Sequence, residues 1–75
     1  MKDIINYILN RGFQYQWSGL DSSNGKLLAK AIYINPITGD VIDIWDDGTF
    51  EIYNQWGKNP ALVVNDPLMS IGLID

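Results

Sequence analysis

The central segment of the chain constrains the fold more than any other part. Two short runs of alternating apolar and polar residues, 41–45 and 49–53, flank the tripeptide Asp46-Asp47-Gly48. Alternation of this kind is typical of strands with one buried face. A three-residue loop that ends in glycine, which readily adopts a left-handed conformation, is typical of a hairpin with a bulge. The segment therefore predicts a β-hairpin.

The register of this hairpin follows from the burial of its apolar residues. A three-residue loop places Ile44 opposite Phe50 and Ile42 opposite Ile52. A two-residue loop would instead place Ile44 opposite Glu51, and would mix polar with apolar groups on one side of the sheet. We therefore expect the three-residue loop.

The other side of the same hairpin is polar and aromatic. In the expected register Asp43 lies opposite Glu51, and two like charges that face each other on a sheet are mildly destabilising. We expect a cation nearby, supplied either by Lys30 on the neighbouring strand or by a partner. Trp45 and Tyr53 share this side, and aromatic residues are common anchors of protein interfaces.

The N-terminal part predicts a helix followed by a strand. Isoleucine and leucine residues repeat at helical spacing over residues 3–11, which indicates an amphipathic helix. Aromatic and polar residues then alternate over residues 13–17. This pattern predicts a strand that buries Phe13, Tyr15 and Trp17 on one face.

Turn-forming and β-branched residues indicate the structure of the other segments. They predict a loop over 18–25, a strand over 26–34, a reversal over 35–40, an irregular stretch over 54–60, a candidate fifth strand over 61–64 and a candidate short helix over 66–73. The apolar stretch 68–74 is expected to dock on the sheet or on another copy of the chain. The expected fold is α+β: an N-terminal helix packed on a four- to five-stranded antiparallel β-meander, with a short helical or irregular C-terminal segment.

Length and composition limit the chain to a single small acidic domain over residues 1–75. The sequence has no Cys and no His, which excludes disulfides, thiolate nucleophiles, imidazole bases and the common zinc sites. Asp43 and Glu51 are close enough in this fold to act as acid and base, but an exposed sheet face provides no cleft. No enzymatic activity, cofactor or metal site is expected. With no long apolar segment and no signal-peptide pattern, we expect a cytoplasmic protein that contacts no membrane.

The negative charge is concentrated in the centre of the chain. The net charge is −4, and residues 31–57 contain five acidic residues but no Lys or Arg. Direct binding of nucleic acid needs clustered cations, so a basic protein surface is the favoured partner. Aspartate also caps turns, so part of this acidity has a structural or merely solubilising explanation. The candidate partner-binding residues are Asp40, Asp43, Trp45, Asp46, Asp47, Glu51, Tyr53 and Trp56.

The leading hypothesis is a non-enzymatic protein-binding protein that presents an acidic-aromatic sheet face to a basic surface. Size and charge alone suggest an analogy with compact acidic phage-encoded inhibitors of nucleic-acid-processing complexes, anti-CRISPR proteins among them, in which carboxylates stand in for phosphates. A phage-encoded inhibitor would act in the cytoplasm of the host cell. The alternative is a small homo-oligomeric assembly or accessory module, such as a homodimer held by the apolar C-terminus or by an open strand edge.

Overall fold

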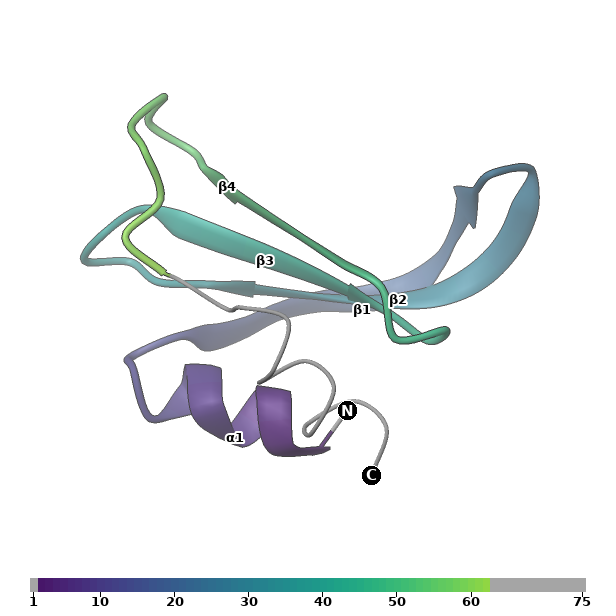
Figure 1. The fold of residues 1–75 in the computed structure, drawn as a ribbon, viewed down its shortest axis with the longest axis horizontal. Helices are drawn as coiled ribbons and strands as arrows, with labels where there is room; N and C mark the ends of the chain where they lie inside the picture. Colours follow the sequence, from purple (N-terminus) through teal and green to yellow (C-terminus); the bar gives the residue numbers. More distant parts are fainter. Residues whose placement is uncertain (1, 63–75) are drawn as a thin grey trace.

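The computed structural model describes residues 2–62, which form one helix and one antiparallel sheet. In chain order the elements are α1 (Lys2–Leu9), β1 (Gln14–Ser23), β2 (Lys26–Ile34), β3 (Asp40–Trp45) and β4 (Phe50–Asn54). The strands lie in the sheet in the order β1-β2-β3-β4, and α1 lies against one face of this sheet (Figure 1). The predicted α+β meander is confirmed with four strands.

The candidate elements at the C-terminal end are only partly covered by the structure. Ala61 and Leu62 belong to no strand. The remainder of the candidate fifth strand, the candidate helix over 66–73 and the apolar stretch over 68–74 lie outside the described residues.

The central hairpin has the predicted register. Ile44 pairs with Phe50, Ile42 pairs with Ile52, and Asp43 lies opposite Glu51. The loop is closed by the backbone N–H of Trp45, which donates to the carbonyl oxygen of Thr49 at 2.8 Å, and Gly48 has a φ of +90°. The apolar pairs lie on the side of the sheet that faces α1.

The predicted loop over 18–25 is wrong, because most of it is strand. β1 continues to Ser23, and the reversal is made by Asn24 and Gly25 alone. Both residues have positive φ, 52° and 78°, as a type I′ hairpin turn requires. The Gly, Ser and Asp residues before this turn are not loop formers here, since they pair along their whole length with β2.

The predicted burial of three aromatic residues on one face is also wrong. Phe13 is buried but precedes the strand, whereas Tyr15 and Trp17 are 58% and 43% exposed. The reason is a β-bulge at Gln16: Tyr15 pairs with Tyr33, and Trp17 pairs with the very next residue back, Ile32. One extra residue in a strand reverses the side on which the following side chains lie. Tyr15 therefore faces α1, and Trp17 lies on the opposite face.

The core lies between α1 and the sheet. Its buried members are Ile4, Ile8, Phe13, Tyr33, Ile42, Ile44 and Leu62. The helix ends two residues earlier than predicted, at Leu9, so Arg11 lies beyond it and stacks over the ring of Tyr7 at 3.5 Å. Because a single helix supplies the second layer, only one face of the sheet is covered by a described element.

Candidate protein-binding surface

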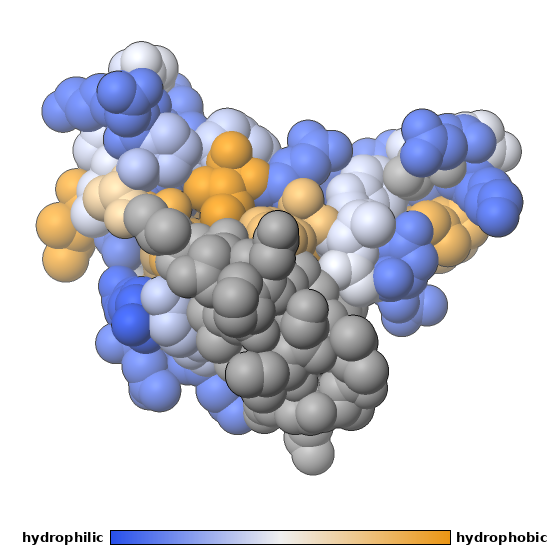
Figure 2. All heavy atoms as spheres, viewed as in Figure 1, coloured by the Kyte–Doolittle hydropathy of each residue, from blue (hydrophilic) through white to orange (hydrophobic). Residues whose placement is uncertain are grey.

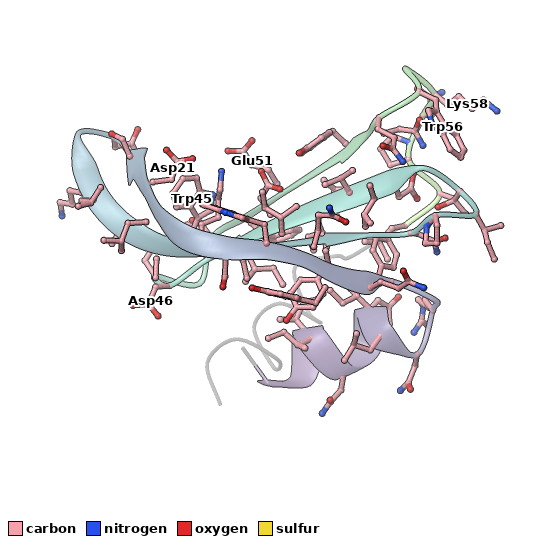
Figure 3. The ribbon with its side chains drawn as sticks, turned by 180° about the vertical axis from the view of Figure 1, so that it is seen from behind. Asp21, Trp45, Asp46, Glu51, Trp56 and Lys58 are labelled. Carbon is pink, nitrogen blue, oxygen red and sulfur yellow. The ribbon has the colours of Figure 1, made fainter. Side chains whose placement is uncertain are left out.

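The face of the sheet that points away from α1, called the open face below, contains the acidic and aromatic residues of the central hairpin. Alternation along the paired strands assigns its members. They are Trp17, Gly19, Asp21, Leu28, Lys30, Ile32, Ile34, Val41, Asp43, Trp45, Glu51 and Tyr53. Figure 3 shows Asp21, Trp45 and Glu51 on this side of the ribbon. In the space-filling view, the side away from α1 is hollowed between two mostly polar ends (Figure 2).

Lys30 is the cation at the centre of the open face. Its Nζ lies 2.7 Å from Oδ2 of Asp21 and 3.8 Å from Oδ2 of Asp43. The same ammonium group lies 4.8 Å from the ring centroid of Trp45. The hydrogen bond to Asp21 raises the pKa of Lys30 above its usual value, although burial acts in the opposite direction. Of the two sources of compensation expected for Asp43, the structure therefore contains the internal one.

Asp43 is a buried carboxylate whose charged form is destabilised by its surroundings. It is only 7% exposed, and burial raises its pKa above the usual value, with Lys30 opposing this and Glu51 adding to it. The hydroxyl of Tyr53 donates a hydrogen bond of 3.4 Å to Oδ1 of Asp43. Burial, and then the negative charge of Asp43, raise the pKa of Tyr53. Asp43 thus contacts Lys30 and Tyr53 from a buried position, whereas Glu51 and Tyr53 are exposed.

Glu51 and Tyr53 are the exposed hairpin residues of the open face. Tyr53 is 43% exposed, and within residues 2–62 Glu51 forms no hydrogen bond or ion pair. Trp17 lies on the same face at the opposite edge of the sheet, in β1, and is as exposed as Tyr53. Its ring lies over Gly19, where a Cβ atom would come within 2.6 Å of the ring atom Cζ2. The glycine therefore lets this indole lie along the sheet.

Asp40 and Trp45 are buried, which gives them structural roles. Asp40 is 1% exposed, and its carboxylate accepts hydrogen bonds from Nδ2 of Asn54 and from the backbone N–H groups of Ala61 and Leu62, each at 2.8 or 2.9 Å. Burial acts to raise the pKa of Asp40, but these hydrogen bonds outweigh it and the pKa is lowered. Trp45 is 7% exposed beneath Lys30.

The two loop aspartates behave differently from each other. Oδ1 of Asp47 accepts hydrogen bonds from the hydroxyl and the N–H of Thr49, which lower its pKa. Asp46 is exposed, and its carboxylate has no partner among the described residues. It lies on the side of the sheet opposite to Glu51 (Figure 3). The acidic residues therefore do not form one continuous patch.

Trp56 lies at the far end of the sheet, beyond β4 (Figure 3). It is 52% exposed, and its ring lies against Gly39 with Nζ of Lys58 5.7 Å from the ring centroid. Oδ1 of Asn54 accepts the backbone N–H of Trp56 at 2.9 Å and so fixes this segment to the strand end. Trp56 is a second exposed aromatic site rather than a part of the hairpin cluster.

Two residues of the open face, Trp17 and Asp21, escaped the sequence-based reasoning. Trp17 was assigned to the wrong face because of the bulge at Gln16, and Asp21 was assigned to a loop because the strand was predicted to end at residue 17. The dipeptide Asn24-Gly25 is a strong hairpin signal and would have extended the strand. Counting back from that turn pairs Gly19 with Lys30, which brings Asp21 beside the lysine.

The chemistry of the open face suits recognition of cations and of apolar or planar groups. Carboxylates accept hydrogen bonds from ammonium and guanidinium groups, and aromatic faces attract both. Residues 2–62 hold no group of three or more His, Cys, Asp or Glu side chains placed to bind a metal ion. In the same part of the chain, no helix has the length and apolar character needed to cross a lipid bilayer.

Comparisons of the chain with protein-family models, with curated proteins and with solved structures gave no match.

Proposed function

We propose that this chain is a non-enzymatic protein-binding protein whose open face receives a basic surface of another protein. One observation carries the proposal. Within the described residues, no helix or strand covers this face, yet it holds the half-exposed Trp17 and Tyr53 and the unpaired carboxylate of Glu51. Exposed aromatic residues near a desolvated charge cluster have the composition of a binding hot spot.

The ion cluster of the open face is a second argument that the partner surface is cationic. Asp21 and Asp43 share the cation of Lys30, and Glu51, opposite Asp43, has no ion pair among the described residues, so the acidic groups of this cluster outnumber the cation that they share. Lys30 already occupies the space between two carboxylates and is 11% exposed. A partner cation would therefore meet Glu51 first and relieve its repulsion with Asp43, at a face whose aromatic groups supply contact area.

In its most specific form, the proposal is that the partner surface normally binds nucleic acid. The chain would occupy that surface in the cytoplasm and so prevent nucleic acid from binding. A phage-type inhibitor would use carboxylates in place of phosphates. Its support is the small size and the acidic open face, and its contact residues would be Glu51, Tyr53 and Trp17, with Trp56 at the margin. Asp40, Asp43 and Trp45 would hold these residues in place.

A pair of charge reversals tests the proposal. Glu51→Lys changes the open face, and Asp46→Lys makes the same change at an exposed site on the opposite side of the sheet. We expect proteins captured from a cell lysate by the wild-type chain to be lost with Glu51→Lys, to be retained with Asp46→Lys and to dissociate as salt is raised. If both variants captured the same proteins as the wild type, the open face would not be the binding surface.

The open strand edges favour a second candidate, a homo-oligomeric module. β1 and β4 are the outer strands of the sheet, and neither has a second neighbour in the described part of the chain. Unpaired edges are templates for pairing with another strand. Light scattering at micromolar concentration distinguishes the candidates: a dimer that persists at high salt supports assembly, and a monomer contradicts it.

A further inference from the structure

A hollow of about 370 Å³ opens on the α1 side of the sheet, away from the open face. Its lining includes Ser18, Leu20, Ala29, Ala31, Ile44 and Asp46, which come from β1, β2, β3 and the hairpin loop. The size is near the lower end of the range of about 300–1,000 Å³ for small-molecule sites. The lining is predominantly apolar, as in such sites.

The hollow arises because the helix is short and the side chains over β1 and β2 are small. An eight-residue helix is about 12 Å long, whereas a ten-residue strand extends over about 33 Å. The sheet thus continues past the helix, and the small side chains of Ala29 and Ala31 leave the space beyond it unfilled by residues 2–62. Leu20 and Leu27 lie along the same strip and are 64% and 68% exposed.

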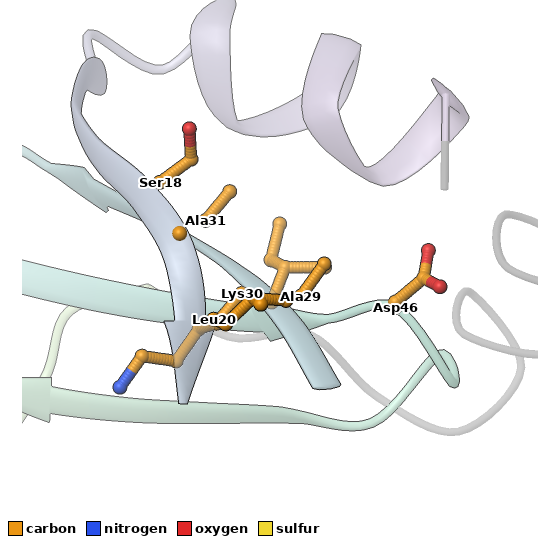
Figure 4. A pocket seen from close by; sticks show the side chains of 8 residues that line it. Ser18, Leu20, Ala29, Lys30, Ala31 and Asp46 are labelled. Atoms are coloured by element: carbon orange, nitrogen blue, oxygen red, sulfur yellow. The ribbon is translucent and has the colours of Figure 1, made fainter. Parts of the chain in front are cut away.

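One charged group faces this apolar surface. Asp46 is fixed at the rim by its backbone N–H, which donates to the carbonyl oxygen of Ala29 at 2.8 Å, and its carboxylate has no partner within residues 2–62. Lys30, which also lines the hollow, does not neutralise it. Figure 4 shows the amine of Lys30 directed away from Ser18, Ala31 and Asp46, and this amine is bound to Asp21.

We propose that this hollow binds a small amphipathic cation, with an alkyl or aryl body against Ala29, Ala31 and Ile44 and an ammonium group beside Asp46. The complementarity is twofold: an apolar floor for the body and a single uncompensated negative charge for the head group. The site is separate from the open face and uses none of its exposed residues. A test of this site is therefore independent of the proposed function.

Titration of the ¹⁵N-labelled chain with hexyltrimethylammonium tests the site. We expect saturable shifts of the amide signals of residues 29, 31, 44 and 46, weaker binding by tetramethylammonium, and no saturable binding by hexanoate. Each methylene added to the alkyl chain should strengthen binding about three- to fourfold while the body is still being buried. Equal binding of hexanoate, or the absence of shifts at these residues, would overturn the proposal.

Two variants and one control separate the site from general effects on the fold. Asp46→Asn is isosteric and exposed, and it should weaken binding of hexyltrimethylammonium at least several-fold while leaving the amide spectrum folded. Ala29→Leu fills the hollow and should abolish binding. Glu51→Gln removes the same charge from the open face and should leave binding unchanged. An equal effect of Glu51→Gln and Asp46→Asn would show non-specific attraction to an acidic protein and would contradict the proposed site.

Discussion

The two faces of the sheet differ in what packs on them and in the kind of residue that each one buries. The face toward α1 is covered beneath the helix by apolar packing, with Ile4 and Ile8 of the helix against Ile42 and Ile44 of the sheet. The open face has no covering element in the described part of the chain, and its partly buried centre is an ion cluster around Lys30. Apolar packing contributes most of the stability of a small domain, whereas a partly buried ion cluster contributes little net stability. The comparison indicates that the packed face contributes most of the stability, which leaves the open face free for the binding that we propose.

The largest effect is expected on the helix side. Ile44 is 1% exposed, and truncation in Ile44→Ala removes buried methylene groups and leaves a cavity. We expect a loss of about 3–4 kcal/mol in the free energy of unfolding, measured by urea denaturation. This is a large part of the total for a small domain, which is about 5–15 kcal/mol. A loss below about 1 kcal/mol would mean that this face does not dominate stability.

A smaller loss is expected at Asp40, which ties the strand end to the segment that follows β4. Asp40→Asn replaces one acceptor oxygen with an NH₂ donor, which then faces either the N–H groups of Ala61 and Leu62, both bound to Oδ2, or Nδ2 of Asn54, bound to Oδ1. We expect a cost of about 2–3 kcal/mol at neutral pH. Leu62 should lose its place in the core at the same time.

The cost of Asp40→Asn should depend on pH. The folded-state pKa of Asp40 lies below the ordinary value of 3.8, so the unfolded state binds more protons between these two values. The stability contributed by this carboxylate is present above pH 3.8 and is lost as pH falls through the folded-state pKa. The difference in unfolding free energy between wild type and variant should therefore shrink in strong acid. A difference that stays constant with pH would show that the charge of Asp40 is unimportant.

On the open face, Lys30→Met should lower the free energy of unfolding by a smaller amount, about 1–2 kcal/mol, because the cluster is partly exposed and its charges are screened. The loss arises from Asp43, which stays 7% exposed but loses its cation. The double variant Lys30→Met with Asp43→Asn should recover most of the stability in urea denaturation. If the second substitution restored nothing, the loss would come from the packing of the lysine stem on Trp45 instead.

The smallest effect is expected at Glu51. Glu51→Lys removes the like-charge pair with Asp43 and places a cation opposite it. We expect unchanged stability or a gain of up to about 0.5 kcal/mol in urea denaturation. A loss of more than about 1 kcal/mol would show that Glu51 is part of the structure rather than a free surface group.

The parts of the fold that depend on local pattern were predictable from sequence. The register of the central hairpin follows from the alternation of apolar and polar residues in its strands and from Gly48 in its loop. Both signals lie within the hairpin itself. The bulge at Gln16 has no comparable signal, so Trp17 was placed on the wrong side of the sheet. The role of Asp40 was equally inaccessible, because its hydrogen-bond donors at Ala61 and Leu62 lie 21 and 22 residues away. A turn aspartate and a buried structural aspartate look the same in sequence.

The most direct test of the division between the two faces combines two measurements on Glu51→Lys. Unfolding free energy and capture of proteins from a lysate are measured on the same preparation, beside wild type and Asp46→Lys. If one face maintains the fold and the other binds, Glu51→Lys keeps wild-type stability and loses the captured proteins, while Asp46→Lys keeps both. Undiminished capture by a stable Glu51→Lys variant would contradict the account.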